Sequence, residues 1–163
     1  LVSQMVELKT GVLMQAATKV GAIFGGGTSE EIEALSEYGK LTGVAFQIHD
    51  DLLGAVGDQE KVGKPIGSDI REGKRTFLAL HAYQEASEGD RKILLDILKK
   101  KGATDEEVEK VLDIYEDTKA IEAAKERAGE LVSKAKAELD ILPDSEAKDF
   151  LLQLADFSIE REL

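Results

Sequence analysis

The chain has 163 residues, a formal net charge of −12 and a pI near 4.7. This acidic balance argues against a nucleic-acid partner held by bulk charge, because duplex affinity depends mainly on cations that contact phosphates. The absence of cysteine excludes disulfides and thiolate metal sites and is compatible with a reducing cytoplasm, where we expect the protein. No apolar run approaches the roughly 20 residues that cross a bilayer, so we expect no membrane span.

Helix-forming residues dominate the composition, and only two prolines occur, which favours an all-α fold. Apolar residues at helical spacing predict a first helix within Leu1–Phe24, ended by the glycines Gly25–Gly27. A second, long helix is expected from Thr28 or Ser29, whose hydroxyls are good N-caps, to about Val56.

The second helix is interrupted by Gly39 and Gly43, one turn apart. Two glycines inside one helix are costly, so they indicate close approach of a neighbouring helix or a ligand. A long glycine-rich loop is predicted over Gly57–Gly73, and bases such as Lys136 further along alternate with acids in the manner of a solvated face. Later helices are expected near Arg75–Ala86, Asp90–Lys101, Asp105–Ala120, Ile121–Leu142 and Ser145–Glu162.

An adjacent pair of carboxylates, Asp50 and Asp51, stands in an otherwise apolar part of the second helix. Burying unpaired carboxylates is costly, so such a pair usually has cationic company. A magnesium ion would provide it, since Mg²⁺ takes oxygen ligands from one or two carboxylates and from substrate phosphates. Gln47 and Gly54 share a helix face with Asp50. The alternative that the residues leave open is a pair of acids on a solvated face.

The segment that follows this helix is locally basic. Between Asp58 and Arg75 there are five basic and four acidic residues, in a chain whose net charge is −12. Lysines act as point charges on phosphate oxygens, and glycines let the backbone approach closely. The segment therefore predicts a magnesium–phosphate site near the acid pair, with a flexible, evenly charged connection as the alternative. His49 and His81 are isolated and receive no role.

An ordered series of short motifs resembles the C-terminal half of the trans-isoprenyl diphosphate synthases, which include farnesyl and geranylgeranyl diphosphate synthases. The order and spacing of the motifs make the resemblance specific, and their texture is most similar to archaeal members. The motifs are Lys9-Thr10, Phe46-Gln47-x-x-Asp50-Asp51-Leu52-Leu53, Gly57-Asp58, Gly63-Lys64, Gly67-x-Asp69 and Gly73-Lys74-x-Thr76, with Leu154-Ala155-Asp156-Phe157 near the end.

The resemblance implies an all-α, antiparallel helical bundle of the isoprenoid synthase type, with residues 1–163 forming the C-terminal portion of a single helical domain. Members of the family are usually homodimers. They join an allylic diphosphate to isopentenyl diphosphate, and Mg²⁺ assists ionisation of the allylic carbon–oxygen bond.

The matching positions imply roles for individual residues. Catalytic roles are implied for Lys9, Asp50 and Lys64: Asp50 would bind Mg²⁺, and the two lysines would contact the allylic diphosphate. Asp51 would support the metal site or pair with a nearby lysine. The further substrate-binding positions that the motifs imply are Thr10, Gln47 and Lys74, beside or around the diphosphate.

Two departures from the family pattern are visible. Gly54 stands where the second aspartate-rich motif ends in a third Asp, and the first aspartate-rich motif is absent. We therefore expect the isolated chain to have at most trace activity and to need the N-terminal half of the enzyme as its partner. A non-catalytic, synthase-like regulatory subunit and a helical interaction domain are the alternatives. A terpene cyclase commonly uses a different second metal motif, which does not occur here.

Overall fold

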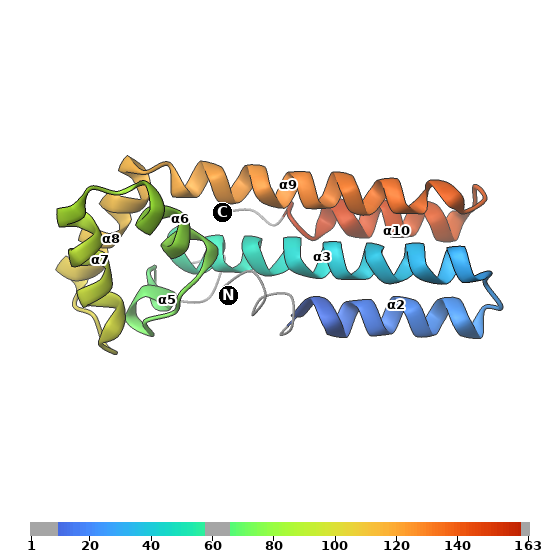
Figure 1. Ribbon diagram of the computed structural model, residues 1–163, viewed down its shortest axis with the longest axis horizontal. Coiled ribbons are helices and arrows are strands. Elements are labelled where there is room, and N and C mark those ends of the chain that lie inside the picture. The colour runs from blue at the N-terminus through green and yellow to red at the C-terminus, as the bar shows by residue number, and fades with distance from the viewer. Residues whose placement is uncertain (1–9, 58–65, 161–163) are drawn as a thin grey trace. The chain divides into compact units, whose positions relative to one another are not determined.

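The computed structural model describes residues 10–57 and 66–160. This part of the chain contains helices and no strand, which confirms the predicted all-α class. None of the helices described is long and apolar enough to cross a membrane. The elements are α2 (Val12–Phe24), α3 (Ser29–Val56), α5 (Ser68–Arg71), α6 (Phe77–Glu85), α7 (Glu88–Lys99), α8 (Asp105–Asp117), α9 (Ala120–Glu138), the 3₁₀ turn η2 (Leu139–Ile141) and α10 (Glu146–Phe157) (Figure 1).

The chain divides into two compact units. Among the described residues, 10–47 and 127–160 form one, which we call the bundle unit, and 48–57 with 66–126 form the other, which we call the short-helix unit. The long helices α3 and α9 contribute to both. That the chain is part of a single helical domain stays a prediction.

The bundle unit consists of α2, α10 and the neighbouring parts of α3 and α9, which lie side by side (Figure 1). Glycines in α3 allow α2 to approach closely. A Cβ atom at Gly43 would lie 2.9 Å from the Cα atom of Gly11, and one at Gly39 would lie 2.7 Å from the carbonyl oxygen of Met14. No side chain fits at these distances, so the prediction of close helix approach is confirmed, and the neighbour is α2.

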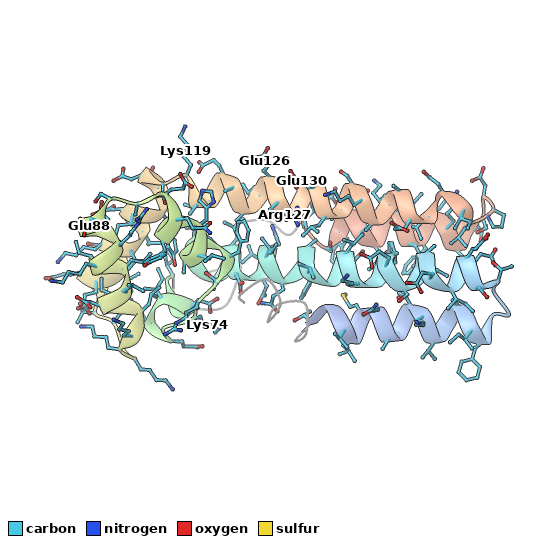
Figure 2. The ribbon with its side chains drawn as sticks, in the orientation of Figure 1. Lys74, Glu88, Lys119, Glu126, Arg127 and Glu130 are labelled. Atoms are coloured by element: carbon cyan, nitrogen blue, oxygen red, sulfur yellow. The ribbon has the colours of Figure 1, made fainter. Side chains whose placement is uncertain are left out.

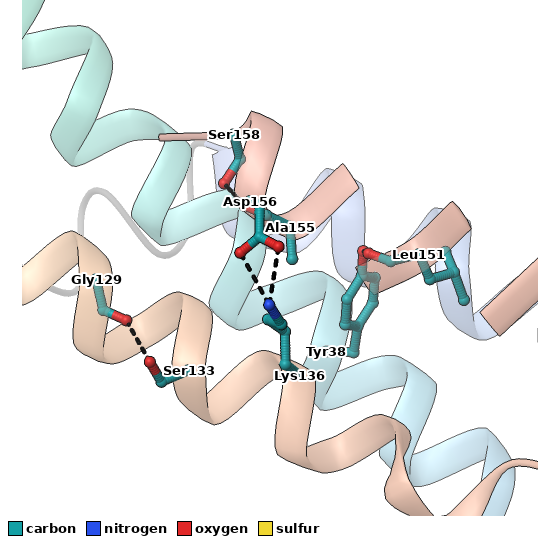
Figure 3. A network of polar contacts seen from close by, with 8 residues as sticks. All are labelled: Tyr38, Gly129, Ser133, Lys136, Leu151, Ala155, Asp156 and Ser158. Carbon is teal, nitrogen blue, oxygen red and sulfur yellow. Dashed lines mark hydrogen bonds and ion pairs between the residues drawn. The ribbon is translucent and has the colours of Figure 1, made fainter. Parts of the chain in front are cut away.

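Polar contacts tie α10 to α9 and α3 in the bundle unit (Figure 3). Lys136 Nζ on α9 lies 3.0 and 2.8 Å from the two carboxylate oxygens of Asp156. The interpretation of Lys136 as part of a solvated face was therefore incomplete, because helical periodicity does not show which partner helix lies opposite. Tyr38, 1% exposed, donates a hydrogen bond of 2.7 Å to the carbonyl oxygen of Leu151.

The short-helix unit packs α5 and α6 against α7 and α8. Hydroxyl side chains cap three of its helices: Thr76 caps α6, Ser87 caps α7, and Thr104 forms a capping box with Glu107 at α8. Each of these caps satisfies backbone donors that have no partner inside the helix. The packed faces enclose apolar side chains, among them Ile70, Leu78, Leu94 and Val111.

Several predicted helix boundaries were wrong, including the end of the last helix, which was predicted near Glu162 and lies at Phe157. The last part of the predicted loop Gly57–Gly73 forms α5, which is too short to produce a periodic pattern. The helix predicted to end at Leu142 ends instead at Glu138 and continues as η2. Pro143 limits how far a helix can extend but does not fix whether its last turn is α or 3₁₀.

Candidate functional site

The acid pair lies inside α3, in the short-helix unit. Buried Ile48 and Leu52 flank it and pack α3 against the core, which brings the carboxylates close to the protein interior. Asp51 is 6% exposed, whereas Asp50 is half-buried. The Asp50 carboxylate has no hydrogen bond or ion pair with any residue in the described part of the chain, so it can accept an external ligand.

A second buried carboxylate belongs to Asp69 on α5, which is 6% exposed. Its Oδ1 atom accepts a hydrogen bond of 2.5 Å from Nζ of Lys74, which also lies 3.2 Å from Glu72 (Figure 2 labels Lys74). Partial burial lowers the pKa of Lys74, but the hydrogen bonds that its ammonium donates to Asp69 and Glu72 outweigh this effect, and the pKa is raised. The ammonium is therefore held in its charged form beside a buried acid.

Asp69 lies directly against Gly54 of α3. A Cβ atom at Gly54 would be 2.8 Å from Oδ2 and 3.0 Å from Cγ of Asp69. The carboxylate of Asp69 therefore occupies the space next to α3 that a side chain at position 54 would enter.

Tyr115 of α8 adds a hydroxyl to this region and is 2% exposed. Burial raises the pKa of Tyr115, a hydrogen bond with Thr76 opposes the rise, and the negative charges of Asp69 and Asp51 add to it. The phenol therefore stays neutral and can donate a hydrogen bond in the neighbourhood of two acids. Asp69 and Tyr115 were not singled out from the sequence, although the Gly67-x-Asp69 motif contained a signal for Asp69.

The backbone around Asp69 is held from both sides. Gly67 and Gly73 have φ angles of +72° and +68°, a region that suits glycine. Arg71, between them, donates a hydrogen bond of 2.9 Å to the carbonyl oxygen of Ala103 and lies 2.6 Å from a carboxylate oxygen of Asp105. These contacts fix α5 and therefore fix Asp69.

Two predicted substrate-binding residues meet in the bundle unit. The hydroxyl of Thr10 donates a hydrogen bond of 2.7 Å to Oε1 of Gln47. Lys9 and Lys64, the two predicted catalytic lysines, lie outside the described residues. Their roles stay predictions.

Asp50 and Asp51 could supply only part of the ligands of a magnesium ion. In the described part of the chain, no three His, Asp or Glu side chains gather closely enough to hold a metal by themselves. One or two carboxylates completed by phosphate oxygens and waters are the usual ligands of Mg²⁺ in phosphate-handling sites. Asp50 and Asp51 fit that pattern.

A separate groove of about 230 Å³ opens between α6 and α7 and contains none of the predicted site residues. It is mostly apolar, with Arg75 and Lys99 as its cations. The groove lining also includes Ala79, Leu80, Tyr83, Leu94, Leu95 and Leu98.

Residues 2–115 match the sequence model of the Polyprenyl synthetase family. The chain belongs to the polyprenyl synthetase family. It is 48% identical over 160 residues to a short chain isoprenyl diphosphate synthase of Methanothermobacter thermautotrophicus, covering 98% of this chain and 48% of the relative. A geranylgeranyl pyrophosphate synthetase of Pyrococcus horikoshii superposes with a TM-score of 0.89 and 41% identity, covering 97% of this chain and 48% of the other.

A further polyprenyl synthetase structure, the geranylgeranyl pyrophosphate synthase of Corynebacterium glutamicum complexed with isoprenyl diphosphate and magnesium, is 36% identical with a TM-score of 0.78. The similarity covers 87% of this chain and 41% of that one. The chain thus spans about half the length of the relatives that it matches. These likenesses confirm the predicted family and the isoprenoid synthase type of helical fold.

Proposed function

We propose that this chain is the C-terminal, diphosphate-binding part of a trans-prenyltransferase. The whole enzyme would condense an allylic diphosphate with isopentenyl diphosphate and make short-chain products of the farnesyl or geranylgeranyl class. The observation that carries the proposal is the half-buried Asp50 carboxylate, which has no partner within the described residues and stands next to buried Asp51. A helical interaction domain has no need of such an arrangement.

The chemical demand is to stabilise a departing diphosphate, which carries large negative charge. Asp50, supported by Asp51, would hold a magnesium ion, and the positive charge of that ion would offset the negative charge of the leaving diphosphate. Lys9 and Lys64 would contact the diphosphate oxygens as point charges. Thr10 and Gln47, joined by their hydrogen bond, would orient the substrate. Cytoplasmic location and a homodimeric enzyme belong to the same proposal.

The partner required for activity is the N-terminal half of the enzyme. The relatives are about twice as long as this chain, and α2 and α10 expose large apolar side chains that the rest of such an enzyme would cover. Phe24 is 88% exposed, and Phe150 is 64% exposed. Surfaces of this kind are typical of protein interfaces.

Calorimetric titration of the chain with inorganic pyrophosphate, with and without Mg²⁺, tests the diphosphate site. We expect magnesium-dependent binding that Asp50→Ala weakens by about tenfold or more, because one lost charge-assisted contact of about 1.4 kcal/mol or more has that effect. Glu106→Ala is the matched control, since Glu106 is exposed in the first turn of α8. Equal and mild effects of both substitutions would remove Asp50 from the site.

Product assays address the catalytic role. The isolated chain, given an allylic diphosphate, isopentenyl diphosphate and Mg²⁺, should show at most trace turnover, and addition of an N-terminal half from a related enzyme should raise it. Ordinary turnover by the chain alone would contradict the requirement for a second half. Magnesium-dependent pyrophosphate binding that never yields product with any added half would favour the regulatory-subunit alternative.

A further inference from the structure

We infer that Gly54 is a positioning residue: its missing side chain leaves the space in which the Asp69 carboxylate lies against α3 and holds Lys74. The effect of Gly54 on diphosphate binding rests on the proposed function. The contacts among Gly54, Asp69 and Lys74 do not depend on it. Position 54 is then a place where a side chain must be absent, rather than a place where a metal ligand has been lost.

The Asp69 carboxylate leaves no room for a side chain at Gly54. An added Cβ would approach Oδ2, Cγ and Oδ1 of Asp69 to 2.8, 3.0 and 3.3 Å. The first of these distances requires something to move. The neighbouring atoms belong to a carboxylate that is itself 6% exposed, on a side chain too short to swing away as a lysine can.

Asp69 cannot move away from Gly54 easily, because contacts hold its helix α5 in place. Its helix α5 has only four residues and lies between the positive-φ glycines Gly67 and Gly73. A Cβ at Gly73 would lie 2.7 Å from the carbonyl oxygen of Leu98, so this end of the segment is already in close contact with α7. The Arg71 contacts with Ala103 and Asp105 hold the other side of α5.

The position of Lys74 depends on Asp69. Its ammonium lies 2.5 Å from Oδ1 of Asp69, and a Cβ at Gly54 would approach the same oxygen to 3.3 Å. Lys74 was predicted to complete a cationic rim around the diphosphate. In the structure its nearest partner is Asp69. Lys74 therefore neutralises a buried acid and acts on the site through Asp69. Displacing Asp69 would therefore also release Lys74.

A double-mutant cycle in urea unfolding tests the packing claim. Gly54→Ala should lower the unfolding midpoint when Asp69 is present. In the Asp69→Ala background the same change should leave the midpoint unchanged or raise it, because the conflicting oxygens are gone and Ala favours helix over Gly. Gly129→Ala in α9 is the matched control, since a Cβ there meets nothing within 4 Å, and it should not depend on residue 69. An equal effect of Gly54→Ala in both backgrounds would overturn the inference.

A second measurement follows Lys74 directly. After reductive ¹³C-methylation, the Lys74 resonance, identified by its loss in Lys74→Arg, should titrate at lower pH in Asp69→Asn and in Gly54→Ala than in the unchanged chain. The resonance of exposed Lys119 is the reference and should be the same in all three proteins. An unchanged Lys74 titration in Gly54→Ala would show that residue 54 does not control the pair.

Restoring the family's aspartate gives the sharpest contrast. Gly54→Asp should weaken magnesium-dependent pyrophosphate binding several-fold, because two carboxylates would compete for one space. Tighter binding would show that position 54 is only a vacant ligand position and would overturn the inference. If Gly54→Asp does not fold, Gly54→Ser replaces it. Should the unchanged chain not bind pyrophosphate, the proposed function fails, whereas the unfolding cycle still decides the role of Gly54.

Discussion

Thr10 and Gln47 are 37 residues apart in the chain, and their side chains are joined by a hydrogen bond of 2.7 Å. Both positions were implied by the resemblance as neighbours of the diphosphate, and the fold of the bundle unit brings them together. The bond fixes the amide of Gln47 with its oxygen toward the Thr10 hydroxyl. Its NH₂ group, the only donor of that side chain, is thereby set in a defined direction.

Thr10→Val should remove this bond while keeping the shape of the side chain. We expect a loss of about 0.5–1.5 kcal/mol in the free energy of unfolding, the usual worth of a partly buried hydrogen bond. Thr10→Ser keeps the hydroxyl and should retain most of the stability. Urea unfolding measures both variants, and an unchanged free energy of unfolding in Thr10→Val would show that the bond contributes nothing to stability.

Gly39→Ala and Gly43→Ala should each destabilise the bundle unit by about 1–3 kcal/mol, the usual cost of overpacking, despite the higher helix propensity of alanine. The reason is the contact of α3 with Met14 and Gly11 at distances that no Cβ tolerates. Gly129→Ala, with open space around its Cβ, should instead stabilise the chain by up to about 1 kcal/mol. Thermal unfolding of the three variants compares them, and destabilisation by all three alike would contradict the packing argument.

Tyr38→Phe removes the hydrogen bond from α3 to the Leu151 carbonyl while preserving the buried ring. The expected cost is about 1 kcal/mol of unfolding free energy. Tyr83→Phe serves as the control, because Tyr83 is exposed on α6. The difference in urea midpoint between the two variants is the quantity to measure, and its absence would mean that the Tyr38 hydroxyl contributes nothing to the packing of α10.

Stability should fall as the pH rises above about 10, the ordinary pKa of tyrosine. Burial raises the pKa of Tyr115 in the folded chain, so above that pH the unfolded state loses the phenolic proton while the folded state keeps it. The unfolded state then binds fewer protons, and the free energy of unfolding decreases with pH. The raised pKa values of Tyr38 and Lys74 act in the same direction.

The Tyr115 contribution can be isolated with Tyr115→Phe. This variant should show a shallower decline in urea midpoint between about pH 9 and about pH 11, because it has no phenol to ionise. An identical decline in both proteins would remove Tyr115 as a cause. Below about pH 9 the two curves should run parallel, since the Tyr115 hydroxyl is neutral in both folded and unfolded states there.

Local sequence patterns were sufficient for most of the helices. The long helix from Ser29 to Val56 was predicted with its bounds, since an N-cap hydroxyl, first-turn acids and an apolar stripe are all contained in the segment itself. The short α5 was missed, because four residues give no periodicity and form a helix here only through contacts with α7 and α8.

The helical class, the family and the acid pair at Asp50 and Asp51 could be predicted before the fold was known, because these depend on residue types and on spacing along one segment. The contact of Asp69 with Gly54, the hydrogen bond of Lys74 to Asp69 and the link of Lys136 between α9 and α10 were found only in the folded chain. Electrostatic partners are chosen by distance in space, and residues separated by a turn or a helix carry no local pattern that records which charges will meet.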